Sequence, residues 1–189
     1  MQLALVTLPA TEPVTLVEAK LYTKVDTSAD DDLLTSLITA ARQYAEQYTL
    51  RAFINQTWQL TLDYDEFCLD SRFINLPRGN IQSITSFTYY NTDNTSAVFA
   101  NTNYRLSDNR LVLNDSADWP VFSRLYNAVT IEYVAGYGTA ADKVPRSIKQ
   151  AMLMLIDHYY INRNAATSSV NQMPFGVTAL LQPFRLFAL

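Results

Sequence analysis

The sequence predicts an α+β fold: helical segments from both ends of the chain flank a central antiparallel β region. Two observations support this. Apolar residues recur at steps of three and four along residues 33–48 and 148–159, which is the spacing of one helix face. From residue 56 onward apolar and polar residues alternate, as in half-buried antiparallel strands. The two long helices are expected to pack together, with the sheet covering or extending from that pair.

The 189 residues are expected to form one domain, because a chain of this length can bury a proper core. Its expected parts are a helical part (14–50 and 144–163), a β insertion (55–135) and a C-terminal docking tail (174–189).

Two capping patterns predict the first helices. Thr15 and Glu18 have the spacing of a capping box, which predicts a short helix to about residue 22. Ser28 is expected to cap a second helix, with the aspartates at 30–32 in its electropositive first turn. This second helix has a continuous apolar stripe: Leu33, Leu34, Leu37, Ile38, Ala41, Tyr44, Ala45 and Tyr48.

The β region is expected to begin with a strand at residues 56–64, where Trp58, Leu60, Leu62 and Tyr64 alternate with polar residues. Pro77 ends a short strand, and the polar residues 91–96 predict a hairpin turn. Further strands are predicted at 73–76, 81–90, 97–100, 104–106, 110–113 and 128–134.

The helix at residues 144–163 is predicted to have apolar residues on two sides. Pro145 suits its first turn, and one face is apolar from Ile148 to Tyr159. Leu153 and Tyr160 lie among the polar residues of the opposite side. We interpret them as covered either by a partner or by another segment of the same chain.

The tail at residues 174–189 is strongly apolar, with Arg185 as its one charged residue. Chain ends fray unless they are anchored, so the tail is expected to lie on its own core or on a neighbouring subunit, and we favour the neighbour. The candidate partner-interface residues are Leu153, Tyr160, Leu180, Leu181, Phe184, Arg185, Leu186 and Phe187.

The composition argues against several classes of function. A net charge of −4 and a pI near 4.9 disfavour a protein that grips DNA phosphates over a broad surface. One cysteine, Cys68, permits no intrachain disulfide, and together with the single His158 it makes no conventional zinc site. The four glycines form no phosphate-binding loop. We therefore predict no enzyme, no catalytic, cofactor-binding or metal site, and no cofactor.

No signal peptide is expected, because residues 1–10 are apolar but lack a preceding Lys or Arg and reach Pro9 too soon. No run approaches the ~20 apolar residues of a membrane span. A soluble protein in a reducing cytoplasm is the expectation.

Short motifs occur in a characteristic order through most of the chain. They are Val14-Thr15-Leu16-x-Glu18-Ala19-Lys20, Asp31-Asp32-Leu33-Leu34, Gln56-Thr57-Trp58, Leu76-Pro77-Arg78, Trp119-Pro120, Ala135-Gly136-Tyr137, Val144-Pro145-x-x-Ile148-Lys149-Gln150-Ala151 and Leu180-Leu181-x-Pro183-Phe184-Arg185. In order and spacing the chain resembles the head–tail connector (adaptor) proteins of long-tailed bacteriophages and prophages, in the variant with a β insertion between the helices.

This resemblance implies a structural virion protein without catalysis. Its copies would form a ring, commonly of twelve, between the portal protein and the stopper or tail-completion protein. The ring would extend the channel through which double-stranded DNA passes non-specifically. The implied location is the virion neck, after assembly in the host bacterial cytoplasm, with no membrane partner.

Two alternatives remain at this stage. One is a tail-completion or neck protein that contacts the tail tube rather than the portal. The other is a small-ligand binding module, since Tyr44, Tyr48, Trp58, Tyr89 and Tyr90 are of the kind that lines pockets.

Overall fold

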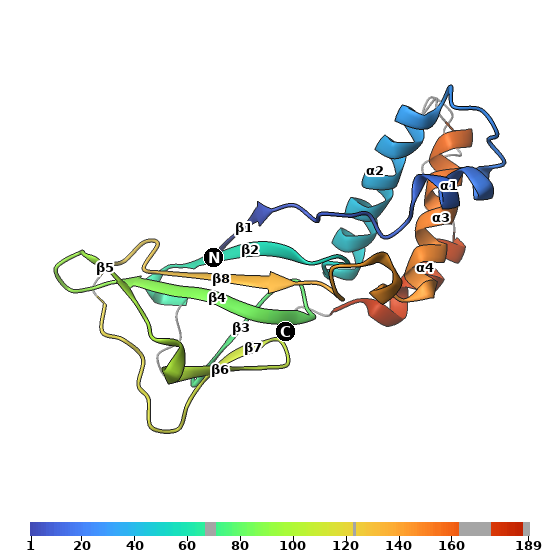
Figure 1. The fold of residues 1–189 in the computed structure, drawn as a ribbon. Coiled ribbons are helices and arrows are strands. Elements are labelled where there is room, and N and C mark those ends of the chain that lie inside the picture. Colours follow the sequence, from blue (N-terminus) through green and yellow to red (C-terminus); the bar gives the residue numbers. More distant parts are fainter. Residues whose placement is uncertain (67–70, 123, 163–174, 187–189) are drawn as a thin grey trace. The chain divides into compact units, whose positions relative to one another are not determined.

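The computed structural model describes residues 1–66, 71–122, 124–162 and 175–186, and it confirms the α+β class. The chain divides into two units, which we call the β unit (Met1–Leu8 and Asn55–Gly136) and the helical unit (Pro9–Ile54 and Tyr137–Leu189). Figure 1 shows the strands in the first and the α-helices in the second. The organisation of residues 1–189 as one domain stays a prediction.

The β unit contains a five-stranded antiparallel sheet in the order β1-β2-β8-β4-β5. Its strands are β1 (Gln2–Thr7), β2 (Gln56–Leu62), β4 (Ile81–Tyr90), β5 (Ser96–Val98) and β8 (Val129–Ala135). The alternation in β2 and β8 is confirmed, since every second residue of each is buried. β1 was not expected from the sequence, and the predicted first strand ends two residues early. Tyr64 instead begins a 3₁₀ turn, η1 (Tyr64–Glu66).

The strand register places apolar residues opposite one another in a row across the sheet. Leu3 pairs with Leu60, Leu60 with Ile131, and Ile131 with Phe87. The Phe87 ring then meets Phe99 at 5.1 Å and Trp119 at 6.2 Å between centroids. This row is therefore the core face of the sheet.

A second, three-stranded sheet has the order β3-β7-β6, with β3 (Phe73–Asn75), β6 (Tyr104–Ser107) and β7 (Arg110–Leu113). Tyr104 of β6 reaches the same aromatic cluster, with its ring 6.0 Å from Phe87 and 5.9 Å from Phe99. The 3₁₀ turn η2 (Asn101–Asn103) leads into β6. Aromatic packing thus links the two sheets of the β unit.

The helical unit contains α1 (Leu16–Thr23), α2 (Asp31–Thr49), α3 (Arg146–Ile161) and α4 (Phe175–Leu181), with 3₁₀ turns η3 (Ala141–Lys143) and η4 (Gln182–Phe184). Its buried apolar core draws on every one of these α-helices. The core includes Ala19, Leu34, Ile38, Ala41, Ala45, Ile148, Met152, Leu155, Ile156, Val177 and Leu181. None of the helices in the described part of the chain has the length and apolar composition needed to cross a bilayer.

The predicted helix starts are confirmed at α1 and wrong at α2. At α1, the Glu18 N–H donates to Thr15 Oγ1 at 3.2 Å, and the Thr15 N–H donates to Glu18 Oε2 at 2.8 Å. At α2 the N-cap is Asp30 rather than Ser28, and its side chain makes no capping hydrogen bond. Ser28 instead accepts the Asp31 N–H through its backbone carbonyl at 3.3 Å, because the chain makes a turn there before the helix begins.

Candidate functional site

The tail lies on the helical unit itself. Val177 and Leu181 of α4 are fully buried in the unit's core. α4 lies directly against α3, since a Cβ on Gly176 would approach Met154 Cε to 2.8 Å. Burial of two aliphatic side chains is a stabilisation of roughly 1.5–3 kcal/mol each, which is enough to anchor a short terminal helix.

Hydrogen bonds anchor the residues after α4 to the end of α2. Arg51 Nε donates to the Phe184 carbonyl at 2.6 Å, and the Leu186 N–H donates to the Thr49 carbonyl at 2.9 Å. The Tyr48 hydroxyl donates to Gln182 Oε1 at 2.7 Å. The bonds at Phe184 and Leu186 satisfy backbone polar groups of an irregular chain segment, so the tail is fixed through residue 186.

Leu153 and Tyr160 are both half-buried and pack against the core of their own unit. The Tyr160 hydroxyl also donates to Asp30 Oδ2 at 2.6 Å. This bond ties the last turn of α3 to the N-cap of α2. Both side chains are thus partly covered by the same chain, which is one of the two interpretations that the sequence offered.

The tail residues differ in what they offer to a partner. Leu181 has no exposed surface, so its assignment to a partner interface is wrong; the core of its own unit covers it. Leu180, Phe184 and Leu186 are half-buried, and Arg185 is exposed, with its guanidinium 5.5 Å from the Tyr48 ring. Phe187 lies outside the described residues. A partner role for Leu153, Tyr160, Leu180, Phe184, Arg185 and Leu186 stays a prediction.

The sequence-based list missed an exposed apolar pair on α1. Val17 and Leu21 are one helical turn apart and are 76% and 82% exposed. The capping box was enough to predict that these two side chains are exposed. With Thr15 as N-cap, the buried Ala19 fixes the inner face of α1 and turns residues 17 and 21 outward.

Ion pairs organise the charged residues of the helical unit. Arg42 is buried and donates from Nε to Glu12 at 2.8 Å and from Nη1 to Glu46 at 2.9 Å. Burial opposes the charge of Arg42, but the two carboxylates outweigh it and raise the pKa of the guanidinium. Glu46 Oε1 also accepts the Phe53 N–H at 2.8 Å, so this buried charge cluster also positions the chain after α2.

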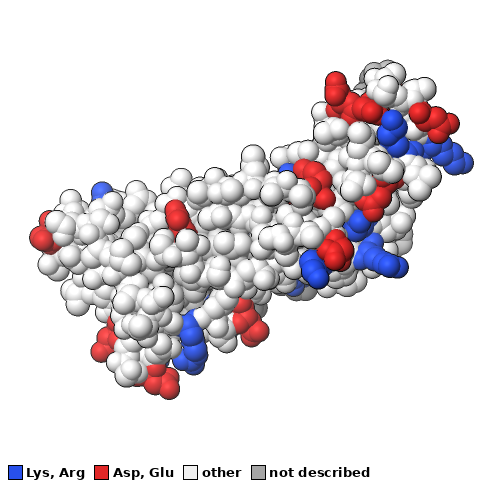
Figure 2. Space-filling model, viewed as in Figure 1, with Lys and Arg blue, Asp and Glu red and all other residues white. Residues whose placement is uncertain are grey.

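A second cluster joins α1 to its neighbours. Lys149 Nζ lies 2.8 Å from Glu18 Oε1, and Lys20 Nζ lies 2.6 Å from Asp31 Oδ1. Partial burial alone would raise the pKa of Glu18, but hydrogen bonds from Lys149 and Thr15 outweigh it and lower the pKa. In the view of Figure 2, acidic and basic side chains alternate over the helices. The charges visible over the helices are thus of mixed sign and form no patch of one sign.

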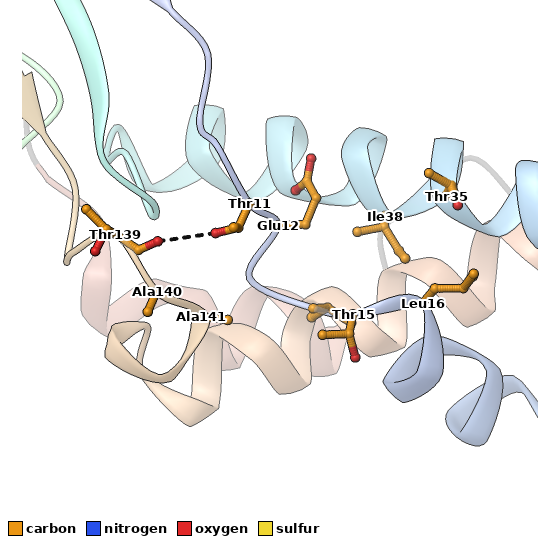
Figure 3. A pocket seen from close by; sticks show the side chains of 10 residues that line it. Thr11, Glu12, Thr15, Leu16, Thr35, Ile38, Thr139, Ala140 and Ala141 are labelled. Carbon is orange, nitrogen blue, oxygen red and sulfur yellow. Dashed lines mark hydrogen bonds between the residues drawn. The ribbon is translucent and has the colours of Figure 1, made fainter.

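A groove of about 410 Å³ lies within the helical unit, between the chain before α1, the side of α2 and the loop before α3. In Figure 3 its wall is a mixture of threonines and aliphatic side chains, and the Thr11 hydroxyl donates to the Thr139 carbonyl at 3.3 Å. Glu12, its one charged lining residue, is already paired with Arg42. None of the aromatic residues considered for a ligand pocket lines this groove.

Those aromatic residues are divided between the two units. Tyr44 and Tyr48 pack against the helical core. Trp58 is buried, and the guanidinium of Arg78 lies over its ring, 4.4 Å from the ring centroid. The guanidinium of Arg124 lies over the Tyr90 ring, 3.9 Å from its centroid. These contacts are structural cation–π packing.

His158 is half-buried on α3, with Nδ1 3.2 Å from Asn162 Nδ2. Over the described ranges, no three residues of the types His, Cys, Asp or Glu are grouped so as to hold a metal ion.

Comparison with known proteins gave one family and several structures. A family model described as "Head completion protein" matches residues 13–177. A chain from the neck of an empty GTA particle computed with C6 symmetry superposes with a TM-score of 0.81 at 24% identity, covering 100% of this chain and 97% of that chain. The coverage is the same for a chain from the virion of a native gene transfer agent (GTA) particle, with a TM-score of 0.78 at 23% identity.

A third structure, the neck of a native GTA particle computed with C12 symmetry, gives a TM-score of 0.76 at 24% identity, again covering 100% of this chain and 97% of that chain. At these identities the superpositions establish a shared fold over the whole chain. No match was found among curated proteins.

Proposed function

Because the chain belongs to the head completion protein family, we propose that it is a non-enzymatic structural protein of the virion neck. Copies of it form a ring between the portal protein and the stopper or tail-completion protein, and the ring extends the DNA channel. The observation that carries this proposal is the superposition of the whole chain, in both units, on chains of GTA necks.

A ring of twelve subunits is the favoured stoichiometry. Among the superposed chains, one comes from a neck computed with C12 symmetry and another from a neck computed with C6 symmetry. A closed ring needs heterologous contacts, in which one surface of each subunit meets a different surface of the next. The half-exposed residues Leu153, Leu180, Phe184 and Leu186, with the exposed Arg185, supply one such surface on the helical unit.

The electrostatics suit a channel that DNA passes without being held. The net charge is −4, and three of the 14 Lys and Arg residues (Lys20, Arg42 and Lys149) are paired with carboxylates in partly buried or buried positions. Strong DNA binding depends on free Lys and Arg neutralising phosphates. Contact with exiting double-stranded DNA is therefore brief and independent of its sequence.

The test uses DNA-filled heads that carry the portal but lack this protein. Added purified protein should co-sediment with the heads, and electron microscopy should show an added ring beneath the portal. Assembly takes place in the host bacterial cytoplasm, so the same ring should be seen on heads taken from lysed cells that express the protein. Heads that sediment without the protein would overturn the connector function.

The alternative is a neck protein that contacts the tail tube. The family description, head completion, favours the head side. Parallel incubation with purified tails distinguishes the two, because a connector binds heads in the absence of tails. Binding to tails alone would favour the alternative.

A further inference from the structure

The outer edge of β1 is open and unusually unprotected. β1 is the first strand in the sheet order, and no strand of the described residues pairs with its outer side. Natural edge strands are usually blunted by charged side chains, proline or bulges. Residues Gln2–Thr7 contain no charge and no proline, and the one irregularity is a register shift between Leu5 and Thr7. The segment Gln2–Leu5 therefore presents regular, unprotected backbone.

The opposite edge of the same sheet is β5. The Phe99 N–H donates to the Phe87 carbonyl at 2.8 Å, and the Asn91 N–H donates to the Thr95 carbonyl at 2.9 Å. Bonded and non-bonded pairs alternate along an antiparallel ladder, so the backbone polar groups of Ser96 and Val98 point away from β4. The Val98 side chain is 71% exposed. No strand in the described part of the chain pairs with this side of β5, so β5 has its own open hydrogen-bonding edge.

One row of residues crosses the sheet from edge to edge, on the face opposite the core row. Gln2 pairs with Thr61, Thr61 with Thr130, Thr130 with Thr88, and Thr88 with Val98. Gln2 and Val98 therefore lie at the two ends of a single row and on a single face. A copy placed beside the sheet in continuous register would bring its Val98 next to Gln2.

We propose that β1 of one subunit pairs with β5 of the next, so that the five-stranded sheets of neighbouring copies join around the ring. The inference rests on the proposed function, because a ring needs two different and complementary surfaces on each subunit. Two open edges of one sheet meet that need, and strand addition is a common mode of recognition. Since the edges are uncharged, no unpaired charge is buried at the junction.

The orientation of the pairing follows from the topology. Successive antiparallel neighbours in the order β1-β2-β8-β4-β5 reverse direction four times, so β1 and β5 run the same way. Neighbours in a ring of twelve are rotated by about 30°, which preserves strand direction. The junction is therefore parallel, and the register that places Val98 beside Gln2 pairs residues 97–99 of one subunit with residues 1–3 of the next.

A junction this short is weak by itself. A three-residue parallel pairing makes few hydrogen bonds and buries far less area than a stable dimer interface. We expect the isolated protein to pair only transiently, and the ring to persist where the head holds subunits in place.

Cysteine pairs test the junction directly. In a Cys68→Ser background, the double variant Gln2→Cys/Val98→Cys is bound to portal-bearing heads and oxidised. Adjacent strands lie ~4.8 Å apart, which is within the ~4.4–6.8 Å Cα separation that a disulfide needs. Denaturing gels should show a ladder of covalent oligomers that ends at the ring size. Each single-cysteine variant should give at most a dimer.

The matched control is Gln2→Cys/Val121→Cys, because Val121 is an equally exposed valine of the β unit outside any strand. A ladder from the control as strong as that from the test pair would overturn the specific pairing. Rings seen by electron microscopy with no ladder from Gln2→Cys/Val98→Cys would overturn the pairing and leave the proposed function intact. Heads that acquire no ring from the unaltered protein would overturn both.

Discussion

The Tyr160 hydroxyl donates a 2.6 Å hydrogen bond to Asp30 Oδ2, which joins the end of α3 to the start of α2. A hydrogen bond to a charged acceptor contributes about 1.5–3 kcal/mol. We expect Tyr160→Phe to lower the free energy of unfolding by about that amount in urea titrations. Tyr160→Asp should cost more, because it also removes the ring that packs against the helical core and puts a carboxylate in its place. The neighbouring substitution Tyr159→Phe is the control, and an equal loss from both Phe variants would refute the assigned role of the bond.

The buried cluster around Arg42 predicts an asymmetry between two substitutions. Glu46→Ala removes one partner of a buried guanidinium and leaves the Phe53 N–H without its acceptor, so a loss of roughly 3–5 kcal/mol is expected. Asp142→Ala, at an exposed carboxylate, should change stability by less than about 0.5 kcal/mol. Thermal unfolding followed by circular dichroism measures both. A small effect of Glu46→Ala would mean that the cluster is solvated in solution.

Adjacent leucines of α4 should separate folding from assembly. Leu181 is fully buried, so Leu181→Ala should cost roughly 2–5 kcal/mol of stability. Leu180 is half-buried, and Leu180→Ser should leave the melting temperature close to that of the unaltered protein while weakening ring formation on heads. Co-sedimentation with portal-bearing heads supplies the second readout. Normal head binding by Leu180→Ser would remove that residue from the interface.

The lowered pKa of Glu18 predicts how the free energy of unfolding depends on pH. Its pKa is lowered in the folded protein, so its contribution is present above the unfolded pKa, near 4.5, and is lost as the pH falls through the folded value. Because the side chain is 41% exposed, the contribution should be below about 1 kcal/mol. Unfolding titrations between pH 3 and pH 6 should show a shallower slope for Glu18→Gln. An unchanged slope would assign the acid dependence to other carboxylates.

Local patterns in the sequence were enough to predict most elements. The capping box of Thr15 and Glu18, the alternation in β2 and β8, and the apolar stripe of α2 each depend on residues close together in the chain. Ser28 was the predicted cap of α2, and the prediction was wrong because the preceding turn ends two residues later, at the N-cap Asp30.

Long-range relationships were not predictable in this way. β1 pairs with β2, which lies more than fifty residues later in the sequence. The apolar residues of β1 are consecutive, so they do not alternate with polar residues as in a half-buried strand. The surface on which the tail packs could not be predicted either. The hydrogen bonds that place it come from Thr49 and Arg51, and nothing in the tail's own composition distinguishes that surface from a neighbour's.

The Tyr137 N–H donates to the Phe53 carbonyl at 2.9 Å, so the chain leaves and rejoins the helical unit at two points one hydrogen bond apart. Residues 55–136 are therefore an insertion whose two ends join the helical unit at neighbouring points. The length of this insertion can change without a change in the positions of α2 and α3. An insertion or a shortening within residues 55–136 is then compatible with an unchanged packing of α2 against α3.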